Sequence, residues 1–335
     1  MSETLLSVEH LSTVFSLRGR SMFAPNVELK AVSDVSFSLN GGETLGIVGE
    51  SGCGKSTLGR SILRLIEPTA GRVVWQGRSL TDLSAGEMRK ARRDLSIIFQ
   101  DPVASLDPRM NVGQIIAEPL KVAEPSLTRK ERRGRVEKVM EEVGLAPEMI
   151  NRYPHEFSGG QAQRIGIARA IVTEPKLIVC DEPVSALDVS IQAQIVNLLK
   201  ALKERMGLTL IFISHDLSVV RLVSDRILVL YLGRVVEIGP RREVFANPGH
   251  PYTKALLSAA PIPDPAVARA RGRTVLKGDP PSPINPPSGC AFRTRCPIAR
   301  DVCAEVPPPL AEVGADHRAA CLFWEEVRAD PAVVD

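Results

Sequence analysis

A glycine-rich run close to the N-terminus constrains the fold of this chain more than any other feature. The run is Gly49, Glu50, Ser51, Gly52, Cys53, Gly54, Lys55, Ser56 and Thr57. Apolar residues 44–48 precede it, and a helical pattern begins at Leu58. This spacing between a strand and a helix predicts a phosphate-binding loop, because the glycines let consecutive backbone N–H groups converge on an anion. We expect Lys55 to reach the β- and γ-phosphates of a nucleotide and the Ser56 hydroxyl to bind magnesium.

The segments around this loop alternate between strand and helix patterns. We expect strands at residues 5–15, 31–39, 72–76 and 96–99, with a polar loop at 18–26. The apolar face formed by Leu58, Ile62, Leu65 and Ile66 predicts that the helix after the loop continues until Pro68 stops it. Such alternation is typical of an α/β domain built on a largely parallel sheet.

Residues 100–157 change to a helical pattern. Thr128 and Glu131 have the spacing of a capping box, and Gly144 falls where the C-terminal cap of that helix is expected. We therefore expect an all-helical insert in the α/β domain. The basic run at 129–135 is compatible with an acidic partner or, since glutamates follow it closely, with the solvated face of a helix.

A second glycine-rich helix start follows the insert. Ser158, Gly159, Gly160 and Gln161 combine a capping-box spacing with two glycines, and an apolar helical face begins at Ile165. A helix that begins in this way presents N–H groups, a hydroxyl and the positive end of its dipole. It is a second candidate anion site.

Carboxylates follow the apolar strand expected at 177–180. Asp181 and Glu182 would lie at the carboxyl end of that strand, which is the edge where open α/β sheets bind ligands. Asp181 suits the magnesium shell, through water, because hard cations prefer carboxylate oxygen. Glu182 is the better candidate to orient and deprotonate an attacking water.

The remaining pattern of the α/β part contains a helix, a strand and a hairpin. Residues 189–206 predict a helix closed by Gly207, and residues 208–213 predict a strand that ends before His215. Because His215 follows the end of another strand, we expect it to face the γ-phosphate. Two strands at 227–232 and 234–238 are expected to form a hairpin.

Composition excludes some classes of protein. A net charge of +3 from 42 basic and 39 acidic residues gives no support for a nucleic-acid surface. The longest apolar runs, such as 208–213, are shorter than the roughly 20 residues that cross a bilayer. Residues 1–9 lack the basic and apolar regions of a signal peptide, so we expect a cytoplasmic protein that is soluble or peripheral.

The C-terminal part combines prolines with cysteines. Prolines between 261 and 287 predict an extended connection. The cysteines that follow are Cys290, Cys296, Cys303 and Cys321. Disulfides are not expected in a reducing cytosol, which leaves a [4Fe-4S] cluster, zinc or unlinked thiols, with His317 as a weaker alternative ligand.

The motifs together resemble the ATP-binding-cassette (ABC) ATPases, and most closely the ATP-binding subunits of oligopeptide and dipeptide importers. The resemblance covers nearly the whole chain. It is carried by the phosphate loop, Phe99-Gln100-Asp101-Pro102, His155 to Gln161, Asp181 to Ser190, His215, Asn247-Pro248-Gly249-His250-Pro251-Tyr252-Thr253 and the cysteine-rich tail. It implies a RecA-like α/β nucleotide-binding domain at 1–250 with an antiparallel β part and a helical subdomain at about 101–165. A small Cys-rich extension would occupy 251–335.

The resemblance also assigns roles to residues. Two cassettes would pair head to tail, so that ATP on Lys55 and Ser56 of one is closed over by Ser158, Gly159, Gly160 and Gln161 of the other. Asp188 would lie at the seam, and Gln100 would complete the magnesium site and link it to the helical insert. Phe15 would stack on adenine, with Phe23 as a competitor.

Cofactors, partners and cargo are implied in the same way. ATP and Mg²⁺ would bind the phosphate loop, and the four cysteines would hold the [4Fe-4S] cluster. The partners would be a second, related ATPase subunit, two transmembrane permease subunits and an extracytoplasmic substrate-binding protein, at the cytoplasmic face of the bacterial inner membrane. Besides di- and oligopeptides, the cargo could be a nickel chelate, glutathione or an oligosaccharide.

Overall fold

The computed structural model describes residues 4–18, 26–259 and 278–329 of the chain. Contacts between residues divide the chain into two compact units, each described here by itself. Unit 1 contains Asn40–Glu43 and Asp82–Ile213, and unit 2 contains the described residues of Thr4–Leu39, Thr44–Thr81 and Ser214 onward. Phe23 lies outside the described residues, as does much of the proline-rich connection.

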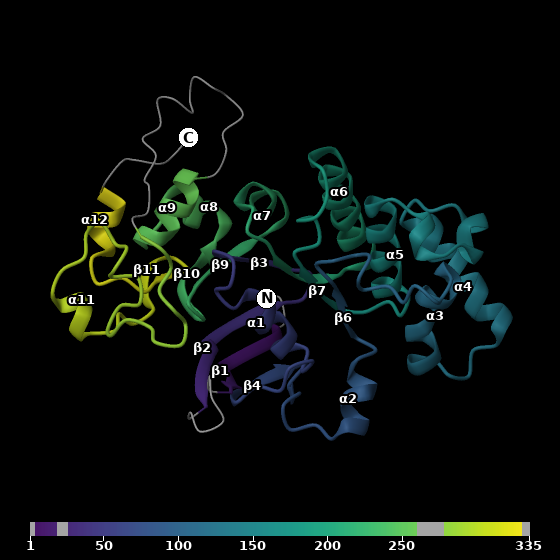
Figure 1. The fold of residues 1–335 in the computed structure, drawn as a ribbon, viewed down its shortest axis with the longest axis horizontal. Helices are drawn as coiled ribbons and strands as arrows, with labels where there is room; N and C mark the ends of the chain where they lie inside the picture. Colours follow the sequence, from purple (N-terminus) through teal and green to yellow (C-terminus); the bar gives the residue numbers. More distant parts are fainter. Residues whose placement is uncertain (1–3, 19–25, 260–277, 330–335) are drawn as a thin grey trace. The chain divides into compact units, whose positions relative to one another are not determined.

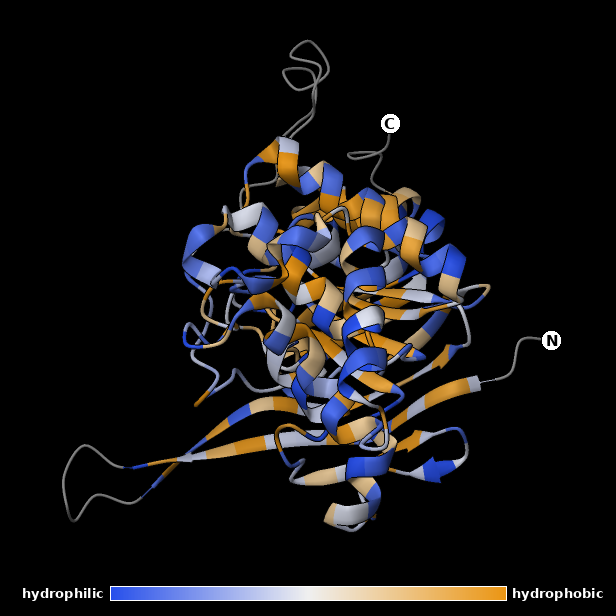
Figure 2. Ribbon diagram, turned by 90° about the vertical axis from the view of Figure 1, so that its right-hand side faces the viewer, coloured by the Kyte–Doolittle hydropathy of each residue, from blue (hydrophilic) through white to orange (hydrophobic). Residues whose placement is uncertain are grey.

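Unit 2 contains an antiparallel sheet in the order β2-β1-β4-β5. Its strands are β1 (Thr4–Leu17), β2 (Val27–Asn40), β4 (Ala70–Trp75) and β5 (Arg78–Ser79). β1 and β2 bury alternate apolar residues, as period-2 strands with one covered face do. Hydrophobic and hydrophilic bands run along both strands (Figure 2). The antiparallel β part of the predicted fold is confirmed.

A second set of strands in unit 2 has the order β11-β12-β10-β9-β3. The bounds are β3 (Thr44–Val48), β9 (Arg226–Tyr231), β10 (Arg234–Pro240), β11 (Ala311–Gly314) and β12 (His317–Ala319). β3 pairs in parallel with β9, whereas the β9–β10 hairpin, β10–β12 and β11–β12 are antiparallel. Figure 1 shows β10 and β11 close together, so strands from the C-terminal part extend this sheet.

The helices of unit 2 are mostly short. They are α1 (Lys55–Ile62), α7 (Leu217–Val223), α8 (Arg241–Ala246), α9 (Pro251–Ala259), α11 (Val302–Glu305) and α12 (Trp324–Ala329). The expected length of α1 was wrong, because the helix ends at Ile62 and Leu65 is 45% exposed. Arg64 takes a positive φ of 51°, and the Leu65 N–H bonds back to Arg60 O at 2.8 Å, which closes the helix before Pro68.

Unit 1 contains the parallel strands β6 (Leu95–Ile98), β7 (Leu177–Asp181) and β8 (Thr209–Ile213). Its helical elements are α2 (Ala85–Ala91), α3 (Val112–Ala123), α4 (Arg129–Glu142), η1 (Pro147–Asn151), η2 (Pro154–Glu156), α5 (Gly159–Ile171) and α6 (Val189–Met206). Figure 1 shows α3, α4 and α5 packed beside one another, which agrees with the contacts among them. The helical insert expected from the sequence is therefore present.

Helix ends in unit 1 follow the sequence signals. Thr128 and Glu131 form a capping box at the start of α4, and Gly144 follows its end with a φ of 73°. α6 has the predicted bounds and ends at Gly207, whose φ is 65°. Local sequence sets these boundaries, because side-chain caps and glycines at positive φ satisfy backbone groups that the helix leaves unpaired. In the described part of the chain, none of the helices combines the length and apolarity needed to span a membrane.

Candidate nucleotide-binding and catalytic site

The glycine-rich run forms a tight loop between β3 and α1 in unit 2. All five residues of β3 are buried, so the strand fixes the start of the loop. Gly54 has a φ of 105°, and a Cβ there would collide with the backbone carbonyl of Ala31. A Cβ at Gly49 would likewise collide with Leu230 O. These two positions require glycine, because the loop backbone passes directly against neighbouring strands.

Lys55 lies at the start of α1 with its side chain folded over the loop. Its Nζ donates to Gly49 O at 2.8 Å and to Glu50 O at 3.0 Å, and the residue is only 4% exposed. Cys53 contributes main chain rather than its thiol, since the side chain is buried and burial raises its pKa. The loop therefore combines a cation, a helix N-terminus and curved backbone, which together suit a polyphosphate.

Glu182 and Gln100 meet in unit 1. Gln100 follows β6 and Glu182 follows β7, two neighbouring parallel strands whose register pairs Ile98 with Cys180. Gln100 Nε2 donates to Glu182 Oε2 at 3.0 Å. The structure thus brings together two of the three predicted catalytic residues. Asp181, the predicted magnesium residue, is fully buried at the end of β7.

The backbone of Glu182 is strained. Its φ is 48°, in the left-handed region that non-glycine residues seldom adopt. Its N–H donates to Ile213 O at 3.0 Å, and its carbonyl accepts from Ser185 Oγ at 3.1 Å. These bonds hold a conformation that a free chain would leave, and such strain is concentrated at functional sites.

The second glycine-rich helix start forms the capping box predicted from the sequence. Ser158 Oγ accepts from Gln161 N–H at 3.4 Å, and Gln161 Oε1 accepts from Ser158 N–H at 3.1 Å. A Cβ at Gly160 would lie 2.6 Å from Ile191 Cγ2, so the glycine permits close packing of α5 on α6. Ser158 and Gly159 are exposed.

Asp188 caps α6 in the same unit. Its carboxylate accepts from Ser190 Oγ at 2.7 Å and from Ile191 N–H at 3.0 Å. These bonds, the Ser190 bond foremost, lower the pKa of the Asp188 carboxyl below its ordinary value. The side chain therefore stays ionised at neutral pH, at the helix end where the dipole favours negative charge.

His215 and Phe15 belong to unit 2. His215 is exposed and follows Ser214, whose N–H donates to Ile47 O at 3.1 Å beside the end of β3. Phe15 is half-buried near the end of β1. Their roles toward the γ-phosphate and adenine stay predictions.

The four C-terminal cysteines line one small pocket in unit 2, together with aromatic residues and His250. All are free thiols. Burial raises the pKa of Cys321 to about 12 and of Cys296 to about 11, and the neighbouring cysteines add to both effects. Among the described residues, no group of three or more His, Cys, Asp or Glu side chains converges as ligands of a single metal ion.

His317 is not a ligand for that pocket, so the weaker alternative from the sequence was wrong. Its Nε2 is bonded to Glu237 Oε1 at 2.7 Å, and its Nδ1 accepts from Arg328 Nη2 at 2.7 Å. Both ring nitrogens are therefore engaged elsewhere. His317 and Glu237 are completely buried, so the ring serves as part of the core.

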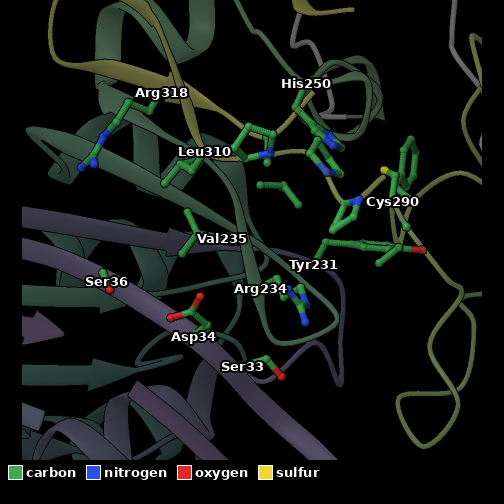
Figure 3. Close-up of a pocket in the computed structure, with 18 of the residues that line it drawn as sticks. Ser33, Asp34, Ser36, Tyr231, Arg234, Val235, His250, Cys290, Leu310 and Arg318 are labelled. Atoms are coloured by element: carbon green, nitrogen blue, oxygen red, sulfur yellow. The ribbon is translucent and has the colours of Figure 1, made fainter. Parts of the chain in front are cut away.

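A larger cavity of about 330 Å³ lies beside the cysteine pocket (Figure 3). Its walls come from β2, from β10 and from the C-terminal segment, and they include Asp34, Arg234 and Arg318. Cys290 and His250 line both cavities. Of the four cysteines, Cys290 is thus the one that faces the larger cavity.

Sequence reasoning missed the residues that contact the phosphate loop from positions far away in the sequence. Arg295 and Tyr252 both contact Glu50, from 245 and 202 residues away. Tyr252 lies in the run from Asn247 to Thr253, which carried the family resemblance but received no role. Arg295 has no local signal, because nothing in the neighbouring sequence indicates which carboxylate it meets.

Comparisons with known proteins agree with this architecture. A family model described as "ABC transporter" matches residues 32–185, and one described as "Oligopeptide/dipeptide transporter, C-terminal region" matches residues 236–303. A solved dimer of the ATP-binding cassette MJ0796 in a post-hydrolysis state with ADP and phosphate is 31% identical, with a TM-score of 0.64, over 71% of this chain and 99% of that one. The structure of cbiO1 from Clostridium perfringens is 30% identical with a TM-score of 0.62, over 73% of this chain and 91% of that one. The fold and the phosphate loop define the class of ABC ATPases.

Similar proteins identify a particular family within the ABC ATPases. The oligopeptide transport ATP-binding protein OppF of Haemophilus influenzae is 58% identical over 96% of this chain and 97% of its own length. The OppF protein of Salmonella typhimurium is 58% identical over 96% of both chains. The chain therefore belongs to the family of oligopeptide transport ATP-binding proteins.

Proposed function

We propose that this chain is the ATP-hydrolysing subunit of an importer for di- and oligopeptides. The observation that carries the proposal is its 58% identity, over 96% of the chain, to a protein named for oligopeptide transport. The phosphate loop and the Gln100–Glu182 pair support the same activity, because they provide a polyphosphate site and a carboxylate positioned by an amide. The reaction converts ATP and water into ADP, phosphate and a proton.

In this proposal each site residue has a defined task. Loop residues 49–57 would bind the phosphates, with Lys55 on the β- and γ-phosphates. Ser56, Asp181 through water, and Gln100 would hold Mg²⁺, which would supply positive charge to the phosphates. Glu182 takes the proton from the water that attacks the γ-phosphate in line, since a general base must lie within reach of the nucleophile. His215 steadies the γ-phosphate, and Phe15 stacks on adenine.

The complete site requires a second cassette. Ser158, Gly159, Gly160 and Gln161 would close over ATP held by a partner, with Asp188 at the seam. The exposure of Ser158 and Gly159 supports this role, as does the dimeric state of the related MJ0796 structure. We propose that the partner is a related but different ATPase subunit. Two permease subunits and an extracytoplasmic binding protein would complete the transporter at the inner membrane's cytoplasmic face.

The domain division follows from the same proposal. Residues 1–250 form the ABC nucleotide-binding domain, with its helical subdomain at about 101–165. Residues 251–335 form the extension typical of peptide transporters. A match to the C-terminal region of such transporters, at residues 236–303, supports this division.

We also propose that the four cysteines hold a [4Fe-4S] cluster. Cys290, Cys296 and Cys321 are partly buried, and burial raises the pKa of each thiol, so they are poor thiolates unless cationic metal stabilises them; iron in a cluster supplies that charge. A cluster binds each thiolate on a different iron, so convergence on a single ion is not required. When bound, the cluster would supply a rigid cross-link and a one-electron redox centre.

Iron analysis of protein purified without oxygen tests the cluster. We expect iron and sulfide in equal amounts and absorbance near ~400 nm, which is typical of thiolate-bound clusters. Cys296→Ser should lose both, whereas Cys180→Ser should keep them, because Cys180 is buried within β7 and does not line the pocket. A folded, colourless and iron-free chain would overturn the cluster, and stoichiometric zinc would assign the pocket to zinc instead.

Reconstitution of the transporter tests which cargo it imports. The transporter assembled with its permeases and binding protein should take up a labelled tripeptide in an ATP-dependent manner, and Lys55→Met should abolish uptake. A nickel chelate, glutathione and an oligosaccharide serve as competing cargoes. Uptake of one of these, without uptake of peptide, would retain the ATPase role and replace the cargo.

A further inference from the structure

Glu50, the second residue of the phosphate loop, is held by all of its polar groups. Its carboxylate accepts two hydrogen bonds from Arg295, Nη1 to Oε2 at 2.7 Å and Nη2 to Oε1 at 2.9 Å. Its N–H donates to Tyr252 Oη at 2.7 Å. Its carbonyl accepts from Lys55 Nζ at 3.0 Å. All four residues belong to unit 2, and two of them come from the C-terminal part of the chain.

The Arg295–Glu50 pair is shielded from solvent. The Arg295 side chain is 6% exposed and that of Glu50 is 27% exposed. The bidentate geometry fixes the direction of the carboxylate as well as its position. It also neutralises the negative charge of a carboxylate in the loop that is proposed to bind the phosphates of the nucleotide, since like charges repel.

Tyr252 is fixed by its surroundings. It is completely buried, and its ring packs against Tyr231 at 4.7 Å and Phe292 at 5.4 Å between centroids. The Tyr252 N–H donates to His250 Nδ1 at 3.1 Å. The hydroxyl that meets Glu50 therefore has little freedom to move.

The start of α9 is anchored in turn by a buried carboxylate. Glu237 of β10 accepts from Gly249 N–H at 2.7 Å and from His250 N–H at 3.0 Å. The same carboxylate bonds His317 of β12 at 2.7 Å. A continuous series of contacts thus connects β12 with the phosphate loop, by way of Glu237 and the start of α9.

We infer that Arg295 and Tyr252 are positioning residues for ATP binding, which hold the phosphate loop in its binding conformation through Glu50. The inference rests on the proposed ATP site at Lys55 and Ser56. A loop with several glycines loses much conformational entropy when it binds a ligand, unless other contacts have already ordered it. The C-terminal part of the chain supplies that order in advance.

Binding of Mg²⁺–AMP-PNP to the full-length chain tests the carboxylate contact. Arg295→Met should weaken binding by roughly tenfold, a factor that corresponds to about 1.4 kcal/mol. The double variant Glu50→Gln/Arg295→Met should bind more tightly than Arg295→Met alone, since it removes the uncompensated charge. The affinity of Arg295→Lys should lie between those of Arg295→Met and the wild type, because lysine keeps the charge but cannot make the bidentate pair of hydrogen bonds.

Two control variants distinguish a role in positioning the phosphate loop from a role in folding alone. Arg300→Met removes another arginine of the C-terminal part, whose Nη2 donates to both carboxylate oxygens of Glu326 at an exposed site, and should leave binding unchanged. For the main-chain contact, Tyr252→Phe should weaken binding. Its neighbour variant Thr253→Val removes a buried hydroxyl without a hydrogen-bond partner and should not.

The outcomes distinguish the inference from the site on which it rests. If Lys55→Met abolishes AMP-PNP binding while Arg295→Met and Tyr252→Phe bind as the wild type, only the positioning role is overturned. If Lys55→Met itself binds normally, the ATP site is overturned. A lower melting temperature with unchanged affinity would give Arg295 and Tyr252 a purely structural role. Should Arg295→Met fail to fold, Arg295→Lys and the double variant still decide the question.

Discussion

The chain has two glycine-rich helix starts, and they differ in what holds them. At α5, Ser158 and Gln161 satisfy each other's backbone from three residues apart. At α1, the N-cap is Gly54, which has no side chain to contribute, and the preceding loop is held by residues more than two hundred positions away. One site is shaped by its own sequence and the other by the rest of its unit.

The difference matches what each site is proposed to do. A start such as that of α5, capped by its own side chains, needs no support before it meets a partner. A phosphate loop must present several N–H groups at once, so its backbone requires an external frame. Variants that remove local or distant support should therefore act on different measured quantities.

The largest effect is expected at the catalytic carboxylate, whose support is local to unit 1. Glu182→Gln keeps an oxygen that can accept from Gln100 but removes the base, so ATP turnover should fall at least about a hundredfold. Mg²⁺–AMP-PNP binding should persist. Glu148→Gln, at an exposed position of the same unit, is the matched control. Turnover at the wild-type rate would refute the role of Glu182 as base.

The next largest effect is expected at the phosphate loop, where alanine substitutions at two glycines can be compared. Gly54→Ala should cost at least about 3 kcal/mol in the free energy of unfolding, because strain at positive φ adds to a collision with Ala31. Gly52 has a φ of 77° and nothing within 4 Å of an added Cβ, so Gly52→Ala should cost only about 1–2 kcal/mol. Urea denaturation measures both. Equal losses would mean that the contact with β2 does not frame the loop.

A smaller effect is expected from the local cap of α5. Ser158→Ala should lower the free energy of unfolding by about 1 kcal/mol, whereas Ser158→Asp should restore it, since both residues cap well. Binding of AMP-PNP to the single chain should stay unchanged in both variants. If Ser158→Ala weakened that binding, the two helix starts would not be independent.

The smallest effect concerns Asp188. Hydrogen bonds from Ser190 and Ile191 hold its pKa below the ordinary 3.8, so its stabilising contribution is present above that value and lost as the pH falls through the lower folded pKa. Asn caps equally well without titrating. NMR should find the Asp188 carboxyl titrating below 3.8. Asp188→Asn should lose less stability on acidification than the wild type, and equal acid sensitivity would contradict the assignment.

Much of the fold followed from local patterns. The bounds of α6, the strand β3, the capping boxes at Thr128 and Ser158 and the β9–β10 hairpin were all predicted. Each of these features is determined by residues close in sequence, either through apolar periodicity or through a capping residue a few positions away. The strands that precede Gln100 and Glu182 were also predicted, but the contact between the two side chains depends on the pairing of β6 with β7, which only the fold reveals.

The remainder depends on which distant segments meet. β11 and β12 are four and three residues long, too short to show a period; β12 pairs with β10, and β11 pairs with β12. The end of α1 at Ile62 was missed, since Arg64 adopts a conformation that propensity does not predict. The bond from Arg295 to Glu50 joins residues 245 positions apart, so only the folded chain reveals it.

The aromatic ring of Phe292 has a consequence for protein engineering. The ring is buried and nearly perpendicular to that of Tyr231, with 5.2 Å between the ring centroids, and it also contacts Tyr252 and His250. The C-terminal segment therefore shares a hydrophobic core with β9 and α9 and is not an appendage that can be exchanged freely. A chimaera that imports this segment from another ATPase should work only if residues matching Phe292 and Arg295 travel with their counterparts at Tyr231, Tyr252 and Glu50.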